Sequence, residues 1–594
     1  MYKSSRYGLL FFVMMTIAIT WQFAAVPFIV YYTQASDLSI ANLVLSALAN
    51  ALIVVSPYWL IPRRWRWTSW LLMALTTAWG ISQLWYAPTY NDIMPAQVFT
   101  LTGNVNPLLV DAVVGSMRWH DLAIWLPLLV MILLPVRRIK NAFPLWMSDP
   151  HDEQSGKWQP KGFLTTLGAA LLFFIASNLN LLMGDKTFKE NLNERYNTCY
   201  VNAQYCGRNG ILPYIAYSLH EWAHSYKPLD ANERQRLGHF LENEMPRYSN
   251  NVLNDSTRKN LIVVIVESLQ SWPLNLRIDG REVTPAMNRL MRSDNTITCL
   301  NMVSQISYGH SSDGHFIYDT GILPLLQGSV AISFGDRHFP ALAKALQGYD
   351  KREVMCNNLE SWNQTVTPFS YGFEKVYGKN DLAPLLKKHH GIDDNALFDF
   401  VNTRLLPHMR QPFMLQMVTI TMHTPHTAGK LPETWITRAD TLTETGRNYL
   451  NEVHNLDQQL VQLLQRLKQL HLDHNTVVAI VSDHNELDLN KVEGRTKATL
   501  RDTAIPLIIT HAGTTLHYRK VMGQIDLYPT LLDVMGVAQY WWKGFGHSIL
   551  RYPVTSAVNK RHATLGTPNE LTKHQLDAWP MSNLYIRSLT DAKP

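Results

Sequence analysis

The chain has 594 residues, a length that exceeds a single core and predicts two or three structural units. Its formal net charge of +6 is small for this length, and no long basic run occurs, which argues against nucleic acid as a partner. The mean hydropathy of −0.10 averages an apolar first third with a more polar remainder.

Five apolar stretches occupy the first 186 residues, and a helix needs ~20 mostly apolar residues to cross a bilayer core. The first stretch is too long for a cleaved signal peptide, and four more follow it. The sequence therefore predicts a five-helix transmembrane domain over residues 1–186. The predicted spans are residues 8–32, 39–62, 68–87, 121–136 and 163–184, of which the fourth is the shortest.

The loops between these stretches predict the orientation of the domain. Lys and Arg residues lie before the first span, after the second and after the fourth, whereas the other two loops hold only Arg118. Basic loops are retained on the cytoplasmic side of a membrane. The prediction is a multi-pass protein with a cytoplasmic N-terminus, and an odd number of spans places everything after residue 186 outside the cytoplasm.

Residues 187–255 are polar, and we expect a juxtamembrane helical linker there. Within it, His220-Glu221-Trp222-Ala223-His224 matches the HExxH signature of zinc proteases, with Glu242 as a conceivable third ligand. The alternative is an amphipathic helix at the membrane surface, which an apolar stripe of helical period favours. That stripe consists of Ile211, Tyr214, Ile215, Leu219 and Trp222.

The linker also holds two of the four cysteines in the chain, Cys199 and Cys206. Their spacing permits a disulfide in an oxidising compartment, and the alternative is that all four cysteines are free or buried thiols.

The pattern changes at Asn260, where continuous β-branched runs begin to alternate with helical segments. Such runs are typical of buried strands in a parallel sheet. Residues 256–552 are therefore expected to form an extracytoplasmic α/β domain with a mainly parallel central sheet. The runs are residues 261–266, 412–418, 476–481 and 505–509, and a helix is expected at 449–470. Residues 553–594 form a C-terminal tail without a recognisable motif.

Ligands bind beyond the carboxyl ends of parallel strands, and here acidic and imidazole side chains follow three of the runs. Glu267 follows the first, Asp483 and His484 follow the 476–481 run, and His423 and His426 follow the 412–418 run. Oxygen and nitrogen ligands on rigid strand ends suit a divalent cation. An Asp-His pair after a strand can also be a structural hydrogen-bonded pair, and Glu267 is what favours the metal site.

A candidate nucleophile lies in the segment Tyr308–Gly314. A hydroxyl at a glycine-bounded turn can stand at a helix N-terminus, where backbone N–H groups favour a phosphate, and a metal can activate it. Ser311 can instead be a plain N-cap, and both descriptions can hold together. The neighbouring Ser312 is the alternative nucleophile.

Five segments of the chain together resemble the lipoteichoic acid synthase family, in order and spacing, over residues 258–550. That family belongs to the alkaline phosphatase/sulfatase superfamily, and a bundle of five spans before an external domain fits it as well. The resemblance implies an enzyme of the bacterial inner membrane whose catalytic domain is periplasmic. The segments are NLIVVIVESLQSW, GHSSDGHFIY, MHTPH, IVSDHNE and QIDLYPTLLDVMGV.

The resemblance also implies roles for individual residues. Ser311 falls where the family has a nucleophilic threonine that is also a metal ligand, and His423 and Trp362 match residues that contact the substrate head group. The metal implied is Mn²⁺, with Mg²⁺ or Zn²⁺ as alternatives. The implied metal ligands are Glu267, Ser311, Asp483 and His484.

The implied reaction is transfer of a phosphoglycerol head group from a phospholipid to a polymer, glycolipid or glycan, through a covalent phosphoserine. One departure is at the nucleophile, where Ser311 replaces threonine, a change that the superfamily's serine phosphatases tolerate. Two further departures concern the head group: Gln364 stands where the family often has arginine, and Met355-Cys356 replaces a His-Gly step. The alternatives are a phosphoethanolamine transferase of the same fold and a non-catalytic lipid-sensing regulator. A sulfatase is disfavoured because the chain lacks a Cys/Ser-x-Pro/Ala-x-Arg motif around Ser311.

Overall fold

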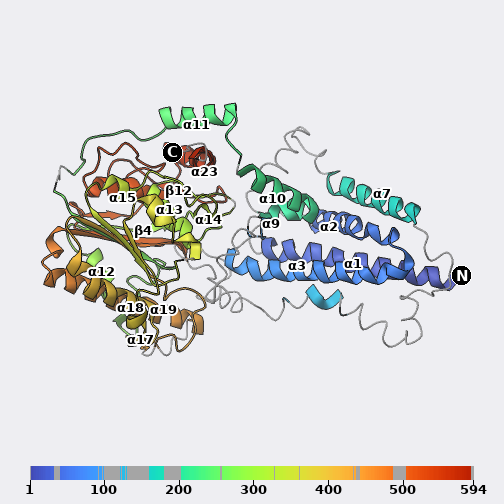
Figure 1. Cartoon of the computed structure of the whole chain (residues 1–594), viewed down its shortest axis with the longest axis horizontal. Helices are drawn as coiled ribbons and strands as arrows, with labels where there is room; N and C mark the ends of the chain where they lie inside the picture. The colour runs from blue at the N-terminus through green and yellow to red at the C-terminus, as the bar shows by residue number, and fades with distance from the viewer. Residues whose placement is uncertain are drawn as a thin grey trace. The chain divides into compact units, whose positions relative to one another are not determined.

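Two compact units divide the chain: one comprises residues 1–96 and 113–222, and the other residues 97–112 and 223–594. The boundary after residue 222 falls inside the predicted linker. The computed structural model (Figure 1) describes residues 2–32, 40–90, 93–96, 98, 121, 124–127, 129, 159–179, 202–225, 227–253, 257–326, 328–359, 361–431, 434–436, 442–485 and 503–589.

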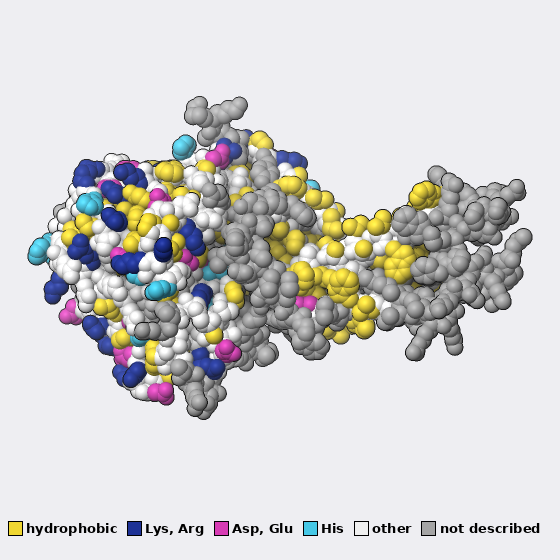
Figure 2. All heavy atoms as spheres, turned by 60° about the horizontal axis from the view of Figure 1, so that its bottom comes forward, with side chains coloured by type: hydrophobic (Ala, Val, Ile, Leu, Met, Phe, Trp, Pro, Cys, Tyr) yellow, Lys and Arg dark blue, Asp and Glu magenta, His cyan; other side chains and the backbone are white. Residues whose placement is uncertain are grey.

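The N-terminal unit is a bundle of helices. Its helices α1, α2, α3 and α7 pack against one another mainly through apolar side chains, and α9 contacts α1 and α2. Figure 2 shows hydrophobic side chains over much of the surface of these helices. Their bounds are α1 Tyr2–Tyr32, α2 Ile40–Val55, α3 Ser69–Tyr90, α7 Pro160–Ser177, α9 Asn202–Asn209 and α10 Ile211–Ser225.

Among the described residues, three helical segments are long and apolar enough to cross a membrane: Leu9–Val30, Ile40–Trp59 and Pro160–Ser177. Leucines on their outer faces, such as Leu172 at 69% exposure, suit contact with lipid. The predicted span at 68–87 does form a helix, α3, but does not meet the same criterion. Most of 121–136 lies outside the described residues. Apolar N-terminal helices are confirmed, and the number of five spans stays a prediction.

The HExxH segment lies on α10, so it has the helical conformation that either interpretation requires. Of its predicted apolar stripe, Ile211 and Tyr214 are buried, whereas Ile215 and Leu219 are 40% and 46% exposed. The side chain of His224 lies outside the described part of the chain, and so does Cys199, the predicted disulfide partner of Cys206.

The globular unit is built around a nine-stranded sheet with the order β10-β4-β9-β8-β1-β7-β5-β6, in which β11 also pairs with β4. Every pairing is parallel except those of β9, which runs antiparallel to β4 and β8. The predicted mainly parallel sheet is confirmed. The strands are β1 Asn260–Val266, β4 Ile297–Val303, β5 Asp350–Met355, β6 Lys375–Tyr377, β7 Phe413–Val418, β8 Thr476–Ser482, β9 Ile505–Thr510, β10 Leu516–Tyr518 and β11 Met522–Gly523.

Helices cover both faces of this sheet (Figure 1). Alternate residues of β1 belong to different cores, Val263 to the one shared with α13, α22 and α23 and Val264 to the one shared with α12, α18 and α19. This alternation explains why both faces of β1 are apolar. The longer helices are α11 Ala231–Asn243, α12 Pro285–Met291, α13 Ser311–Thr320, α18 Asp393–Phe400, α19 Glu444–Gln469, α22 Leu527–Val534 and α23 Glu570–Ser588.

The C-terminal tail is part of the globular unit. Its described residues form the hairpin β12 Ser556–Val558 and β13 Thr564–Gly566, followed by α23. Trp579 of α23 is fully buried, and Arg587 forms an ion pair of 2.7 Å with Glu233 of α11. The tail therefore contributes to the core of the unit.

Two buried carboxyl groups lie close together inside this unit. Asp319, near the end of α13, accepts a hydrogen bond of 3.1 Å from Gln416 of β7. Burial raises the pKa of Asp319 to about 7, and burial followed by the Asp319 charge raises the pKa of Glu353 well above its usual value. Both carboxyl groups therefore keep their protons to a higher pH in the folded protein than in the unfolded chain.

The pair predicts that stability depends on pH. A carboxyl group whose folded pKa is raised contributes stability below its unfolded pKa, and that contribution is lost as pH rises through the folded pKa. We expect the free energy of unfolding to fall between about pH 4 and pH 7, and Asp319→Asn to flatten that fall. Urea titrations at several pH values measure it. Asp336→Asn, at a carboxylate that is 68% exposed, is the control, and identical slopes in wild type and Asp319→Asn would contradict the prediction.

Candidate active site

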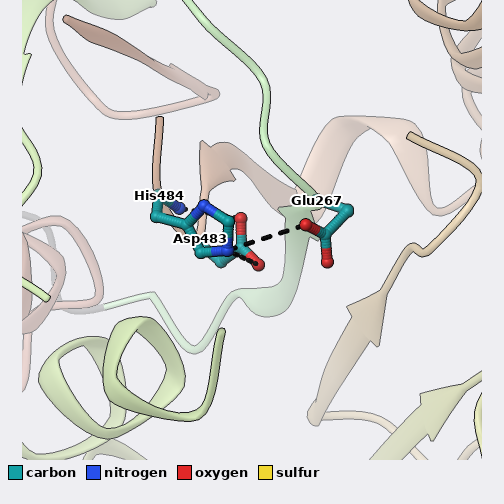
Figure 3. A group of neighbouring side chains, drawn as sticks. All are labelled: Glu267, Asp483 and His484. Carbon is teal, nitrogen blue, oxygen red and sulfur yellow. Dashed lines mark hydrogen bonds and ion pairs between the residues drawn. The ribbon is translucent and has the colours of Figure 1, made fainter. Parts of the chain in front are cut away.

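The carboxyl ends of β1 and β8 bring two acidic side chains together. The parallel register pairs Val266 with Ser482, so the next residues, Glu267 and Asp483, emerge side by side. Both side chains are buried, at 4% and 1% exposure, and both point toward the imidazole of His484 (Figure 3). Ligand atoms of these three residues all lie within 4.8 Å of one another, which is the one such group among the described residues.

The imidazole of His484 is oriented by its neighbours. Its Nε2 lies 3.6 Å from Glu267 Oε1 and 3.5 Å from Asp483 Oδ2. Its Nδ1 lies 2.9 Å from the carbonyl oxygen of Asn485, which can only accept a hydrogen bond. Nδ1 therefore carries the proton, and the lone pair of Nε2 faces the two carboxylates.

This donor set fits a divalent cation. Two carboxylates and one imidazole nitrogen are the oxygen and nitrogen ligands that such ions take in proteins. Burial, and after it the charge of Glu267, raise the pKa of Asp483 to about 6, because two negative charges share a space without water. A cation between them would offset that repulsion.

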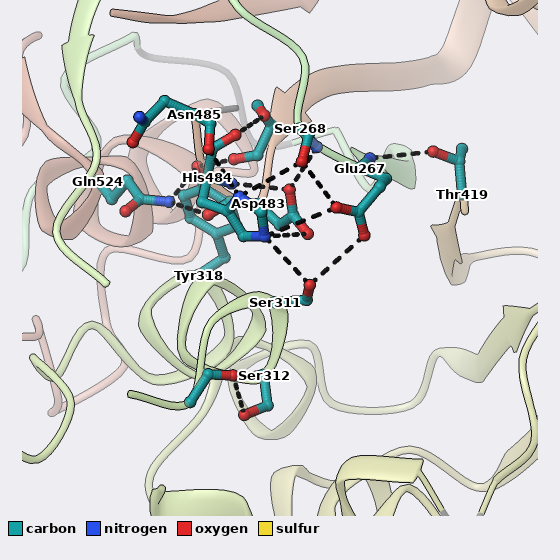
Figure 4. A network of polar contacts seen from close by, with 12 residues as sticks. Glu267, Ser268, Ser311, Ser312, Tyr318, Thr419, Asp483, His484, Asn485 and Gln524 are labelled. Carbon is teal, nitrogen blue, oxygen red and sulfur yellow. Dashed lines mark hydrogen bonds and ion pairs between the residues drawn. The ribbon is translucent and has the colours of Figure 1, made fainter. Parts of the chain in front are cut away.

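Ser311 is the first residue of α13 and lies next to this triad (Figure 4). Its Oγ is 3.4 Å from Glu267 Oε2 and 3.3 Å from His484 Nε2. The preceding residue, His310, has a φ of 45°, a conformation that costs a non-glycine residue energy and that recurs at functional turns. The helix therefore begins abruptly, with the Ser311 hydroxyl presented to the triad.

Ser312 lies on another side of the same helix. Its Oγ donates a hydrogen bond of 2.7 Å to the carbonyl oxygen of Gly309 and lies 3.2 Å from the Ser329 hydroxyl. Figure 4 shows it directed away from the triad. Of the two serines that the sequence left open, Ser311 is the one beside the predicted metal ligands.

Three residues that sequence analysis did not identify hold the triad in place. Ser268 donates from its hydroxyl to Glu267 Oε1 at 2.8 Å and from its backbone N–H to Asp483 Oδ1 at 2.9 Å. Gln524 Nε2 donates to the Asp483 carbonyl oxygen, and Tyr318 donates to that of Ser482. The sequence could have indicated Ser268, because it directly follows Glu267. Gln524 and Tyr318 are distant from the triad in the sequence, and only the fold brings them next to it.

The predicted substrate contacts lie on two separate segments. His423 follows β7 and is half-buried, and its Nδ1 lies 2.7 Å from the Thr424 carbonyl oxygen. The turn after β7 is fixed by Asp394 of α18, which accepts hydrogen bonds from two of its backbone N–H groups. Trp362 lies in a short turn that packs against α14 Val330–Ser333, which contacts α13. Their roles stay predictions.

Gln364 and His426 have structural partners. Gln364 is buried, and its Oε1 accepts a hydrogen bond from the Thr367 hydroxyl at 3.3 Å. His426 forms a fully buried pair with Glu452 of α19, with Nδ1 and Oε2 separated by 2.7 Å. The His426 side chain therefore pairs with Glu452 and not with the triad.

Close packing of α13 against the Asp483 backbone predicts an effect of a methyl group at Gly314. A Cβ there would lie 2.4 Å from the Asp483 carbonyl oxygen, so the ligand must shift. Gly→Ala usually stabilises a helix by about 1 kcal/mol, but we expect Gly314→Ala to weaken Mn²⁺ binding about 10- to 100-fold. Calorimetric titration measures it. Gly238→Ala, at an open helix position, is the control, and unchanged Mn²⁺ affinity in Gly314→Ala would contradict the prediction.

Two sequence families match the chain in succession. The lipoteichoic acid synthase N-terminal domain matches residues 2–227, and the sulfatase family matches residues 259–537. Lipoteichoic acid synthase 2 of Bacillus subtilis is 25% identical over 468 residues, which cover 76% of this chain and 69% of the relative. The lipoteichoic acid synthase of Staphylococcus aureus (strain USA300) is 25% identical over 473 residues, or 76% and 70%.

Solved structures agree in fold. The crystal structure of the lipoteichoic acid synthase LtaP from Listeria monocytogenes covers 61% of this chain and 98% of its own, at 20% identity and a TM-score of 0.50. The integral membrane protein lipooligosaccharide phosphoethanolamine transferase A from Neisseria meningitidis covers 90% and 95%, at 14% identity and a TM-score of 0.52. The matched domains and the relatives show a phosphotransferase that is similar to the lipoteichoic acid synthases in both of its parts, with a globular unit that matches the sulfatase family.

Proposed function

We propose that the chain transfers a phosphoglycerol head group from a phospholipid to an acceptor, in a metal-dependent reaction that passes through a phosphoserine at Ser311. The observation that carries the proposal is the position of the Ser311 hydroxyl, within 3.4 Å of Glu267 and His484 and at the start of a helix. Backbone N–H groups at a helix start favour a phosphate group. The relatives, named as lipoteichoic acid synthases, support this class of reaction.

Glu267, Asp483 and His484 would hold the divalent ion, together with the Ser311 hydroxyl. Mn²⁺ is the ion proposed, and Mg²⁺ and Zn²⁺ suit the same donors. When bound, the ion supplies charge that polarises phosphoryl oxygens and lowers the pKa of the serine hydroxyl. The protein's own part is to keep both carboxylates and the imidazole fixed. The hydrogen bonds that Ser268 donates to the carboxylates and the one that His484 donates to the Asn485 carbonyl oxygen achieve this.

The reaction has two halves. In the first, Ser311 Oγ attacks the phosphorus of the donor, a Ser–O–P bond forms, and the bond from phosphorus to the lipid oxygen breaks. The serine proton ends on the released diacylglycerol. In the second, a hydroxyl of the acceptor attacks the same phosphorus, the Ser–O–P bond breaks, and the acceptor proton returns to Ser311.

His423 and Trp362 are proposed to contact the head group. Gln364 bears on its identity, because its amide is buried against Thr367 and carries no charge to clamp a phosphate. A pocket without that clamp also admits phosphoethanolamine, so transfer of phosphoethanolamine is the second candidate.

The proposed substrates place the enzyme at a membrane. The donor phospholipid lies in the bilayer that the apolar N-terminal helices enter, and the acceptor is a polymer, glycolipid or glycan of the cell envelope. We propose the orientation given by the basic loops: a multi-pass protein of a bacterial inner membrane with a cytoplasmic N-terminus and a periplasmic globular unit.

The nucleophile and the head group can be tested in one experiment. The full-length protein with Mn²⁺ is incubated with phosphatidylglycerol or phosphatidylethanolamine in detergent, quenched, and digested for mass spectrometry. We expect phosphoglycerol on the peptide that contains Ser311. Ser311→Ala should lose the adduct and at least about a thousandfold in turnover, because the covalent route is removed.

Ser312→Ala is the matched control, since it removes the adjacent hydroxyl in the same peptide and should keep the adduct. An adduct from phosphatidylethanolamine alone would select the second candidate. An adduct that persists in Ser311→Ala would exclude this nucleophile. A protein that binds no metal and transfers neither head group would be the non-catalytic regulator that the sequence also allows.

A further inference from the structure

A lysine from the C-terminal hairpin reaches the segment that carries Ser311. Nζ of Lys560 lies 4.8 Å from the centre of the Tyr308 ring, a cation–π distance. Tyr308 is buried and stands three residues before Ser311 in the chain. The two residues are about 250 positions apart in sequence, and the fold alone brings them together.

The turn that carries Lys560 is well fixed. Asn559 accepts hydrogen bonds at its side-chain oxygen from the backbone N–H groups of Arg561 and Ala563, at 3.0 and 3.1 Å. The Asn559 N–H donates to the Ala563 carbonyl oxygen, which closes the turn. Lys560 follows Asn559 in this turn, and its side chain is half-buried.

The hairpin is also tied to the loop before Ser311. The carbonyl oxygen of Val558 accepts hydrogen bonds from Gln305 Nε2 at 2.8 Å and from the Trp579 indole at 3.1 Å. Gln305, Val558 and Trp579 are all buried. Val303, Val521 and Ala557 form one small apolar cluster, which adds to these bonds. The position of Lys560 relative to Ser311 is therefore set by the core of the globular unit.

The positive charge of Lys560 influences two residues that flank Ser311, His310 and Asp313. The positive charge of Lys560 acts on Asp313, whose carboxylate accepts hydrogen bonds from the backbone N–H groups of Ser307 and Gly309, on either side of Tyr308. Among the principal charges acting on His310 and Asp313 in the described structure, Lys560 is the one lysine or arginine. The side chains proposed for the head-group pocket, His423, Trp362 and Gln364, include no lysine or arginine. A donor phospholipid carries a negative phosphodiester, and the two carboxylates of the triad repel it.

We propose that Lys560 binds the anionic phosphate of the lipid donor beside Ser311, so that the C-terminal hairpin supplies a substrate-binding cation to the active site. The inference rests on the proposed function for the identity of the donor, but binding of a phosphate to the site can be measured without transfer. A single ammonium of this kind acts through charge, so arginine can replace it in part and methionine cannot.

The test uses the full-length protein with Mn²⁺ in detergent and two readouts. Calorimetric titration with sn-glycerol 1-phosphate measures phosphate affinity, and phosphatidylglycerol with a fluorescent acyl chain measures kcat and KM. We expect Lys560→Met to weaken binding and raise KM about tenfold, with kcat within about threefold, since the interaction serves the bound substrate as well as the transition state. Lys560→Arg should recover most of the loss.

Lys573→Met is the matched control, because Lys573 lies on α23 in the same tail and is 83% exposed. Wild-type affinity and KM in Lys560→Met would overturn the inference, as would an equal loss in Lys573→Met. If Lys560→Met does not fold, Lys560→Gln takes its place and the same outcomes apply. The two proposals can fail separately. If the wild-type protein binds sn-glycerol 1-phosphate through Lys560 but transfers no head group, the proposed function is contradicted and the role of Lys560 in phosphate binding is retained.

Discussion

The parallel register between β1 and β8 is the constraint on which the site depends. It pairs Val266 with Ser482, so Glu267 and Asp483 leave the sheet at the same level and enter a space that excludes water. Two buried carboxylates repel each other, and burial disfavours both charges. Apart from Asn260, Thr476 and Ser482 at the strand ends, the side chains of β1 and β8 are apolar and have no hydrogen bond to offer the carboxylates. Hydrogen bonds donated by Ser268 offset part of this cost. The Nε2 lone pair of His484 offsets none of it, so the remaining negative charge favours a cation at this site.

The nucleophile is positioned by a second constraint, the close approach of α13 to that pair of strands. Gly314 lies against the Asp483 backbone, where a side chain would not fit. The turn before the helix is kept in shape by Asp313, which accepts hydrogen bonds from the backbone N–H groups of Ser307 and Gly309. These bonds stabilise the unfavourable φ of His310, which directs the Ser311 hydroxyl to the triad. The strained φ of His310, the close packing at Gly314 and the buried carboxyl group of Asp313 thus together position the Ser311 hydroxyl.

Much of this arrangement follows from the sequence, because strands buried on both faces leave a strong signal. The runs at 261–266 and 476–481 are β1 and β8 to within a residue. Glu267 and Asp483, which directly follow β1 and β8, are two of the predicted ligands. The choice between Ser311 and Ser312 requires the rotation of α13, which no local pattern gives. The antiparallel direction of β9 could not be predicted either, because an apolar run does not indicate the direction of a strand. The tail lacked a signal because its contacts, such as the one from Gln305 to Val558, join residues 253 positions apart.

Charge balance links the proposed ion, the donor and the tail. Without an ion, Glu267 and Asp483 present up to two negative charges to a phosphodiester that is itself negative, and Lys560 alone does not outweigh them. If Glu267, Asp483 and His484 held a divalent ion, its charge would balance the two carboxylates, and the charge of Lys560 would make the site net positive toward the donor. Two ligands that each improve the electrostatic environment of the other bind with reciprocal coupling. The affinity for a lipid head group should therefore depend on the ion, and the C-terminal hairpin determines how strongly the donor is held once the ion is bound.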